Sequence, residues 1–217
     1  MMSAASSFRS NALGFKSRAR CARPPTKRNL TIRAGIQPGV DLVTDGKVRL
    51  VRANELKAVL VEEGYKILDT RPDYENERAQ VKGAIHVPYF SVDEGQDPLT
   101  WIRRGMHAGF GGVWNGVPLT KVNENFIEAV TKAVDGDKEI SMVVTCSQGL
   151  RSLVSIKDLY DNGFTNLAWL YGGLNFAQDG VESDGDVTLA EANTGGVSKI
   201  VFDVIESFQK KDEGVQK

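Results

Sequence analysis

The sequence predicts an α/β fold in which neighbouring strands run parallel. Short apolar runs rich in β-branched residues alternate along the chain with stretches that repeat apolar residues at helical spacing. The clearest pair is a buried strand at 140–145 and a helix at 150–162, which ends at Asn162-Gly163, a helix C-cap signal. The chain has 217 residues, 41% of them apolar, which is enough for one full core with extensions.

The other elements flank this strand–turn–helix unit. Apolar patterning predicts strands or extended segments at 48–51, 66–70, 83–88 and 167–171, and helices at about 53–63, 73–79 and 123–134. The folded domain is therefore expected to span residues 48–182. Residues 35–47 contain Gly, Pro and Asp and are expected to form a linker.

Residues 91–120 are long for a connection in an α/β domain. They contain six glycines together with Trp101, Phe110 and Trp114. One interpretation is a surface excursion whose aromatic side chains pin it to the body. The other is a lid or a partner surface, because long loops in compact domains often carry specificity.

The net charge of −1 conceals a basic beginning and an acidic body. Residues 1–40 carry eight basic side chains and no acidic one, and the remainder carries 19 basic against 28 acidic. This composition predicts an organelle transit peptide over residues 1–34. A basic arm that binds nucleic acid is the rival interpretation, but the acidic body would repel phosphate, so we expect no nucleic-acid partner. Cleavage would remove Cys21 and leave one cysteine, too few for a disulfide or a cysteine zinc site.

The chain changes character again after residue 182. Residues 183–217 are expected to form an acidic linker followed by an amphipathic helix, because 197–208 places apolar residues along one helical stripe. One interpretation is a helix docked on the domain. The alternative is a surface for weak contact with a membrane or a partner protein. Its polar face holds Asp203 and Glu206 and few cations, which argues against strong binding to anionic lipid.

The turn between the central strand and its helix holds the candidate chemistry. It reads C-S-Q-G-L-R-S, from Cys146 to Ser152. A strand that enters a helix through such a turn directs several backbone N–H groups, and the positive end of the helix dipole, into the turn. A cysteine there, close to a cation such as Arg151, forms its thiolate more readily than an ordinary cysteine. The competing interpretation is a small buried apolar residue.

Three segments together resemble a known family. L-D-T-R-P with V-K-G-A-I-H-V-P-Y, then V-V-T-C-S-Q-G-L-R-S, then W-L-Y-G-G-L resemble a single-domain rhodanese, a sulfurtransferase, over roughly residues 48–181. With its basic leader, the chain is most similar to plant chloroplast rhodanese-like domain proteins. The resemblance implies a five-stranded, mostly parallel sheet with helices on both faces. It also implies a chloroplast location, in the stroma or at the thylakoid surface.

The resemblance also implies roles for individual residues. Cys146 would be the catalytic nucleophile that carries a persulfide. The loop that binds substrate would consist of Ser147, Gln148, Gly149, Leu150, Arg151 and Ser152. Four residues would have structural roles near the site, namely Asp69, Arg71, Gly172 and Gly173. No metal and no cofactor are expected.

These roles predict sulfur transfer in two steps. The Cys146 thiolate would take sulfane sulfur from a small anionic donor of the thiosulfate or 3-mercaptopyruvate type and pass it to a thiol or cyanide acceptor. A non-catalytic binding or regulatory module in the plastid is the alternative. A cysteine phosphatase is disfavoured, because its C-x5-R loop would place the arginine at position 152, where this chain has serine. A Cys–His protease would need His86 or His107 beside Cys146, and the spacing gives no sign of this.

Overall fold

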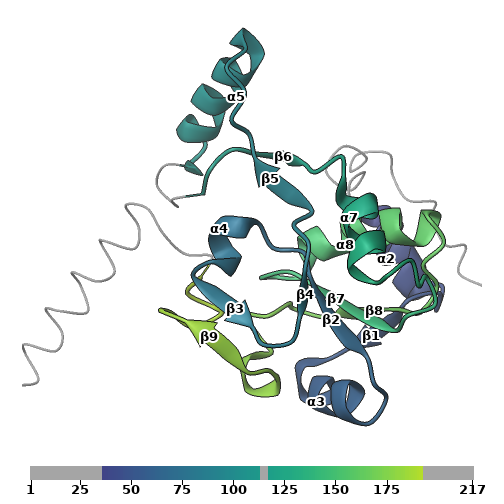
Figure 1. Ribbon diagram of the computed structural model, residues 1–217. Helices are drawn as coiled ribbons and strands as arrows, with labels where there is room; N and C mark the ends of the chain where they lie inside the picture. Colours follow the sequence, from purple (N-terminus) through teal and green to yellow (C-terminus); the bar gives the residue numbers. More distant parts are fainter. Residues whose placement is uncertain (1–35, 113–116, 193–217) are drawn as a thin grey trace, which may run out of the picture.

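Five strands form one central sheet. The computed structural model describes residues 36–112 and 117–192 (Figure 1). Every neighbouring pair in this sheet is parallel, and the strand order is β1 (Arg49–Val51), β8 (Leu167–Leu170), β7 (Met142–Thr145), β2 (Lys66–Asp69) and β4 (Ile85–His86). The predicted α/β architecture with a five-stranded parallel sheet is therefore confirmed.

Two apolar cores lie on opposite faces of this sheet. Successive side chains of a strand point to opposite faces, and Val143 accordingly belongs to one core and Val144 to the other. The Val144 core is closed by three helices, α2 (Gln37–Thr44), α7 (Phe126–Ala133) and α8 (Leu150–Asp161). The Val143 core is closed by α3 (Ala53–Val61) and by the segment that follows β8. Helices thus cover both faces, as the sequence predicts.

The expected linker at 35–47 differs from the structure. Most of it forms α2, which packs against α8 and buries Leu42. Two of the residues that suggested a linker, Pro38 and Gly39, have other roles. Pro38 lies in the first turn of α2, where proline is tolerated. A Cβ at Gly39 would overlap the carbonyl group of Leu153, so glycine allows the two helix backbones to approach closely.

The segment after residue 182 also differs in part from the expected acidic linker. Residues Ser183–Gly185 form β9, which pairs antiparallel with β3 (Ala79–Val81). Leu189 is buried in the Val143 core, so this part of the chain belongs to the domain. The predicted transit peptide at 1–34 and the predicted helix at 197–208 lie outside the described residues.

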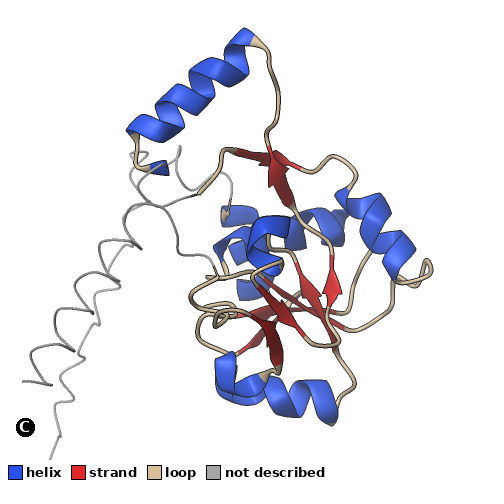
Figure 2. Cartoon of the chain, turned by 60° about the vertical axis from the view of Figure 1, so that its left-hand side comes forward, coloured by secondary structure: helices blue, strands red, loops and turns tan. Residues whose placement is uncertain are grey.

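The described residues within 91–120, which are 91–112 and 117–120, form a helical arm. Strands β5 (Phe90–Val92) and β6 (Thr120–Val122) pair antiparallel, and α5 (Pro98–Gly109) extends from this pair away from the sheet (Figure 2). The expectation that the aromatic residues pin the segment to the body is wrong for Trp101 and Phe110, which are both exposed, and Trp114 is not among the described residues. The glycines suggested a loop, but Asp97 accepts from the N–H groups of Leu99 and Thr100 and starts the helix.

No helix in the described ranges is both long and apolar enough to cross a membrane.

A buried ion pair fixes the end of β2. The guanidinium of Arg71 is fully buried and donates from Nε to both carboxylate oxygens of Asp69, at 3.1 and 2.9 Å. Its Nη2 donates to Asp69 Oδ2 and to the carbonyl oxygen of Ala79, each at 2.7 Å. The pair therefore connects the end of β2 to the start of β3. His86 contacts the carbonyl oxygen of Arg71 through Nε2 at 2.9 Å, so this histidine lies beside the buried pair.

We expect Asp69→Asn to lower the free energy of unfolding by about 3 kcal/mol, because it leaves a buried guanidinium without its counter-charge. Urea unfolding measures this change. Asp161→Asn is the control, because Asp161 forms an exposed ion pair with Lys157 and its loss should cost less than about 0.5 kcal/mol. Similar losses in the two variants would contradict a structural role for the buried pair.

Candidate active site

The candidate site lies where three parallel strands end at one edge of the sheet. Asp69 of β2 is level with Thr145 of β7, and Val144 of β7 is level with Trp169 of β8. Because the strands run in the same direction, the segments that follow them meet at this edge. Cys146 directly follows β7 and therefore lies at the centre of this edge.

Cys146 is buried but faces a cavity. Its exposed fraction is 1%, yet it lines a cavity of about 340 Å³ and belongs to neither apolar core. The backbone N–H of Gly149 donates to Cys146 Sγ at 3.1 Å. The sulfur thus has a polar contact on its loop, which excludes the interpretation of Cys146 as a purely apolar core residue.

Gly149 requires a conformation that other residues rarely adopt. Its φ is 84°, in the left-handed region, and it directly precedes α8. A Cβ at this position would lie 3.2 Å from the nitrogen of Gly172 and 3.3 Å from that of Gly173. Glycine therefore lets the loop pass close to the turn after β8 while its N–H points at the sulfur.

The turn after β8 holds the loop by backbone hydrogen bonds. Leu174 N–H donates to the carbonyl oxygen of Cys146 and Asn175 N–H to that of Ser147, each at 2.9 Å. Gly173 has a φ of 65°, and a Cβ there would overlap the Cys146 carbonyl oxygen. The predicted structural role of this glycine pair therefore has a physical basis in close backbone approach.

Two side chains fix Gly149 through its carbonyl oxygen. Ser152 Oγ and Trp169 Nε1 both donate to that oxygen, each at 2.9 Å. Ser152 is buried and lies behind the loop rather than in the cavity. These contacts limit rotation of the backbone that carries the N–H donor.

A buried carboxylate neutralises the loop arginine. Glu75 of α4 (Asp73–Asn76) is buried and pairs with Arg151, with Nη1–Oε1 at 2.8 Å and Nη2–Oε2 at 2.9 Å. The hydroxyl of Ser147 donates to Glu75 and accepts from Arg151 Nη2 at 2.8 Å. Burial opposes the charge of Arg151, but the hydrogen bonds and charge of Glu75 outweigh it and hold the pKa of the guanidinium above its ordinary value. The cavity therefore contains a paired cation.

Tyr74 supplies a neutral phenol to the same cavity. Burial, followed by the negative charge of Glu75, raises the pKa of Tyr74 to about 12. Its hydroxyl donates to Glu75 Oε1 at 3.3 Å. Because the phenol keeps its proton at neutral pH, Tyr74 adds no charge near the sulfur.

The rest of the cavity wall comes from the C-terminal end of the helical arm and from the exposed loop residues. Val117 and Thr120 line it on one side, and Gln148 and Leu150 line it beside the cysteine. Gln148 and Leu150 are both exposed. Gln148 and Leu150 thus lie along one small opening next to Cys146.

The profile of the Rhodanese-like domain family matches residues 52–176. The chain belongs to this family. Rhodanese-like domain-containing protein 10 of Arabidopsis thaliana is 42% identical over 162 residues, which are 74% of this chain and 75% of that protein. Rhodanese-like domain-containing protein 9, chloroplastic, of the same plant is 35% identical over 155 residues, 71% of this chain and 65% of that protein. A solved rhodanese-like domain from Anabaena is 18% identical with a TM-score of 0.39, and the match covers 63% of this chain and 79% of that chain.

The rhodanese-like domain brings most of the predicted site residues together. Cys146, Gln148, Leu150 and Arg151 line the cavity, while the remaining loop residues Ser147, Gly149 and Ser152 brace it by hydrogen bonds. Asp69 and Arg71 do not line the cavity and pair with each other in the interior. No group of three or more His, Cys, Asp or Glu side chains within 36–112 and 117–192 is arranged to hold a metal ion.

Sequence reasoning missed several residues of this rhodanese-like site. Tyr74, Glu75, Val117, Thr120 and Trp169 all touch the loop or its cavity. One signal was available for Glu75, since the segment after β2 must begin at the same edge of the sheet as Cys146. An acidic side chain there is well placed to pair with the loop arginine.

We expect Glu75→Gln to increase the rate at which Cys146 reacts with anionic reagents, relative to its rate with neutral ones. Removing a carboxylate from a partly solvated site changes the energy of a nearby charge by about 1 kcal/mol, or about fivefold in rate. The measurement is the ratio of the alkylation rates with iodoacetate and with neutral iodoacetamide, because a general change in thiol reactivity cancels from this ratio.

Asp73→Asn is the matched control for this experiment. It removes the same charge from the same helix, but Asp73 does not line the cavity and its side chain is 61% exposed. Equal ratios for the wild type and Glu75→Gln would contradict an electrostatic role for Glu75.

Proposed function

We propose that this protein is a sulfurtransferase that carries sulfane sulfur as a persulfide on Cys146. The observation that supports this function is the 3.1 Å hydrogen bond from Gly149 N–H to a cysteine sulfur on the wall of a small cavity. A donor of that kind stabilises negative charge on sulfur, which a nucleophilic thiolate requires.

The proposed first step forms the persulfide. The thiolate of Cys146 attacks the outer sulfur of thiosulfate, a new S–S bond forms, and sulfite leaves with the electron pair of the bond that breaks. In the second step an acceptor thiolate or cyanide attacks the terminal sulfur, and the electron pair of the Cys146 S–S bond returns to the cysteine as thiolate. Charge and electrons balance in both steps, so no metal or redox cofactor has to take part.

The cavity supports a small, anionic donor. Its volume of about 340 Å³ is near the lower end of ordinary ligand pockets. Arg151 in the wall is paired with Glu75, which fixes the direction of the guanidinium, so the negative charge of a donor would be met mainly by the Gly149 N–H at the sulfur. Donors of the thiosulfate or 3-mercaptopyruvate type meet both requirements.

We also propose a plastid location, in the stroma or at the thylakoid surface. The basic, acid-free residues 1–34 have the composition of an organelle transit peptide. The relative that is 35% identical is named chloroplastic. Imaging of the full chain fused to a fluorescent protein at its C-terminus tests this location.

Persulfide formation tests the proposed function directly. After incubation with thiosulfate or 3-mercaptopyruvate, the wild type should gain the mass of one sulfur atom on the peptide that contains Cys146, and cyanide should remove it. Cys146→Ser, which keeps the size of the side chain, should gain nothing. A wild type that gains no sulfur from either donor would contradict the enzyme and leave the loop as a binding module.

The role of the Gly149 N–H is tested by Gly149→Ala. We expect persulfide formation to slow by about 100-fold, as for loss of one donor in an oxyanion-type site, because the Cβ would push the loop away from Gly172 and Gly173. Gly64→Ala is the control, since Gly64 has a φ of 73° but open space for a Cβ. If both variants reacted at the same rate, the position of this N–H would not matter for the reaction.

A further inference from the structure

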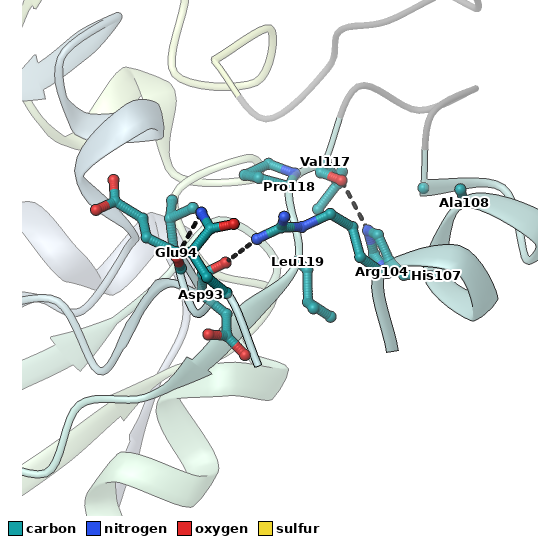
Figure 3. Close-up of a pocket in the computed structure, with 11 residues that line it drawn as sticks. Asp93, Glu94, Arg104, His107, Ala108, Val117, Pro118 and Leu119 are labelled. Carbon is teal, nitrogen blue, oxygen red and sulfur yellow. Dashed lines mark hydrogen bonds between the residues drawn. The ribbon is translucent and has the colours of Figure 1, made fainter. Parts of the chain in front are cut away.

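The polar side of α5 faces the protein. Thr100, Arg104 and His107 recur at helical spacing and lie on this side. Arg104 Nη2 donates to the carbonyl oxygen of Asp93 at 2.9 Å, and His107 Nε2 contacts that of Val117 at 2.7 Å. Figure 3 shows both side chains directed at the two connections that join α5 to the domain. Polar contacts, rather than an apolar core, therefore hold the helix in place.

The apolar side of α5 faces solvent. Leu99, Ile102, Met106 and Phe110 follow one another at spacings of three and four residues, so they share one face. Their exposed fractions are 56%, 60%, 56% and 85%. An ordinary surface helix has the reverse arrangement, with its apolar stripe against the core. Such a contiguous exposed stripe marks an interaction surface.

The charged side chains within α5 itself are arginines. Residues 98–109 contain Arg103, Arg104 and His107 and no acidic residue. Arg103 is exposed beside the stripe, and on the other side the guanidinium of Arg104 lies 5.2 Å from the ring centroid of the exposed Trp101. The nearest acidic residue in the sequence, Asp97, accepts from Thr100 and from the first N–H groups of the helix. The stripe is thus bordered by one exposed cation, Arg103, and by an exposed tryptophan.

We propose that α5 docks this rhodanese-like domain on the surface of a lipid bilayer that contains anionic lipid. An interfacial helix typically has an apolar face with Trp, Phe and Leu and a cationic border that reaches the headgroups. A flat surface can reach the stripe, because α5 projects from the body and no other described element lies over its outer side (Figures 1 and 2). A protein groove is the less favoured occupant, because an apolar stripe with Leu and Phe and a neighbouring Trp is the composition of a helix that lies in a membrane interface.

Docking would bring the candidate active site near the membrane. Val117 lines both the cavity of about 680 Å³ beneath α5 and the smaller cavity at Cys146. The arm therefore joins the proposed membrane surface to the wall of the active site. The docking proposal does not depend on sulfur transfer, since it concerns residues that do not line the cavity at Cys146.

Sedimentation of the full chain with vesicles tests this proposal. We expect binding to vesicles of phosphatidylcholine with one third phosphatidylglycerol, and weaker binding to pure phosphatidylcholine. Ile102→Glu and Met106→Glu should each lower the partition coefficient between vesicles and water at least tenfold. Val61→Glu is the matched control, because it adds the same charge to another exposed helical residue, which is 75% exposed on α3, and it should bind like the wild type.

Tryptophan fluorescence gives a second measurement. Emission of the wild type should shift to shorter wavelength when anionic vesicles are added, and Trp101→Phe should lose most of this shift while it still sediments. Unchanged binding of Ile102→Glu would overturn the proposal and assign binding to another segment, such as residues 193–217. Absence of wild-type binding to the vesicles would also overturn the proposal. Self-association of the wild type that Ile102→Glu abolishes would instead identify a second copy of the chain as the occupant of the stripe.

Discussion

The contact between Gly149 N–H and Cys146 Sγ organises the candidate site. The contact needs support from other residues, because the loop must bend through a left-handed glycine and be held in that conformation. The turn at Gly172-Gly173 and the indole of Trp169 hold it in that position. The strands of the parallel sheet bring these segments to one edge, so the fold itself provides the support for the sulfur.

Charge in the site is balanced within the protein. From the sequence, Arg151 is expected in the loop that binds substrate, as a cation close to Cys146. In the structure Glu75 and Ser147 occupy its guanidinium, so Arg151 serves as part of the wall and as a brace for the loop. The cost of burying Glu75 is offset by this bidentate pair, and the negative charge of a thiolate must then be met mainly by backbone N–H groups. The stability of a thiolate at Cys146 therefore depends mainly on the conformation of the loop.

The parts of the fold that follow from local sequence were predictable. The strand before Cys146, the helix after it and the glycine between them lie within one continuous segment, and their patterns are strong. Glu75 was not predictable in the same way, because its partner lies 76 residues away and only the sheet register brings the two together. The helices α2 and α5 were missed for another reason. Their glycine and proline residues suggested loops, whereas tertiary packing at Gly39 and the cap at Asp97 permit helices.

The orientation of α5, with its polar side inward, follows from the hydrogen-bond acceptors on the connections that join it to the domain. The connections at Asp93, Gly95 and Val117 offer backbone carbonyl oxygens to the helix, and Arg104 and His107 satisfy three of them. Since these donors must face inward, residues half a turn away must face outward, and in this sequence those residues are apolar. A purely structural arm would gain solubility from polar residues at the same positions without losing any of these contacts. The described contacts of the fold therefore do not require the apolar stripe, whereas the proposed contact with a bilayer does.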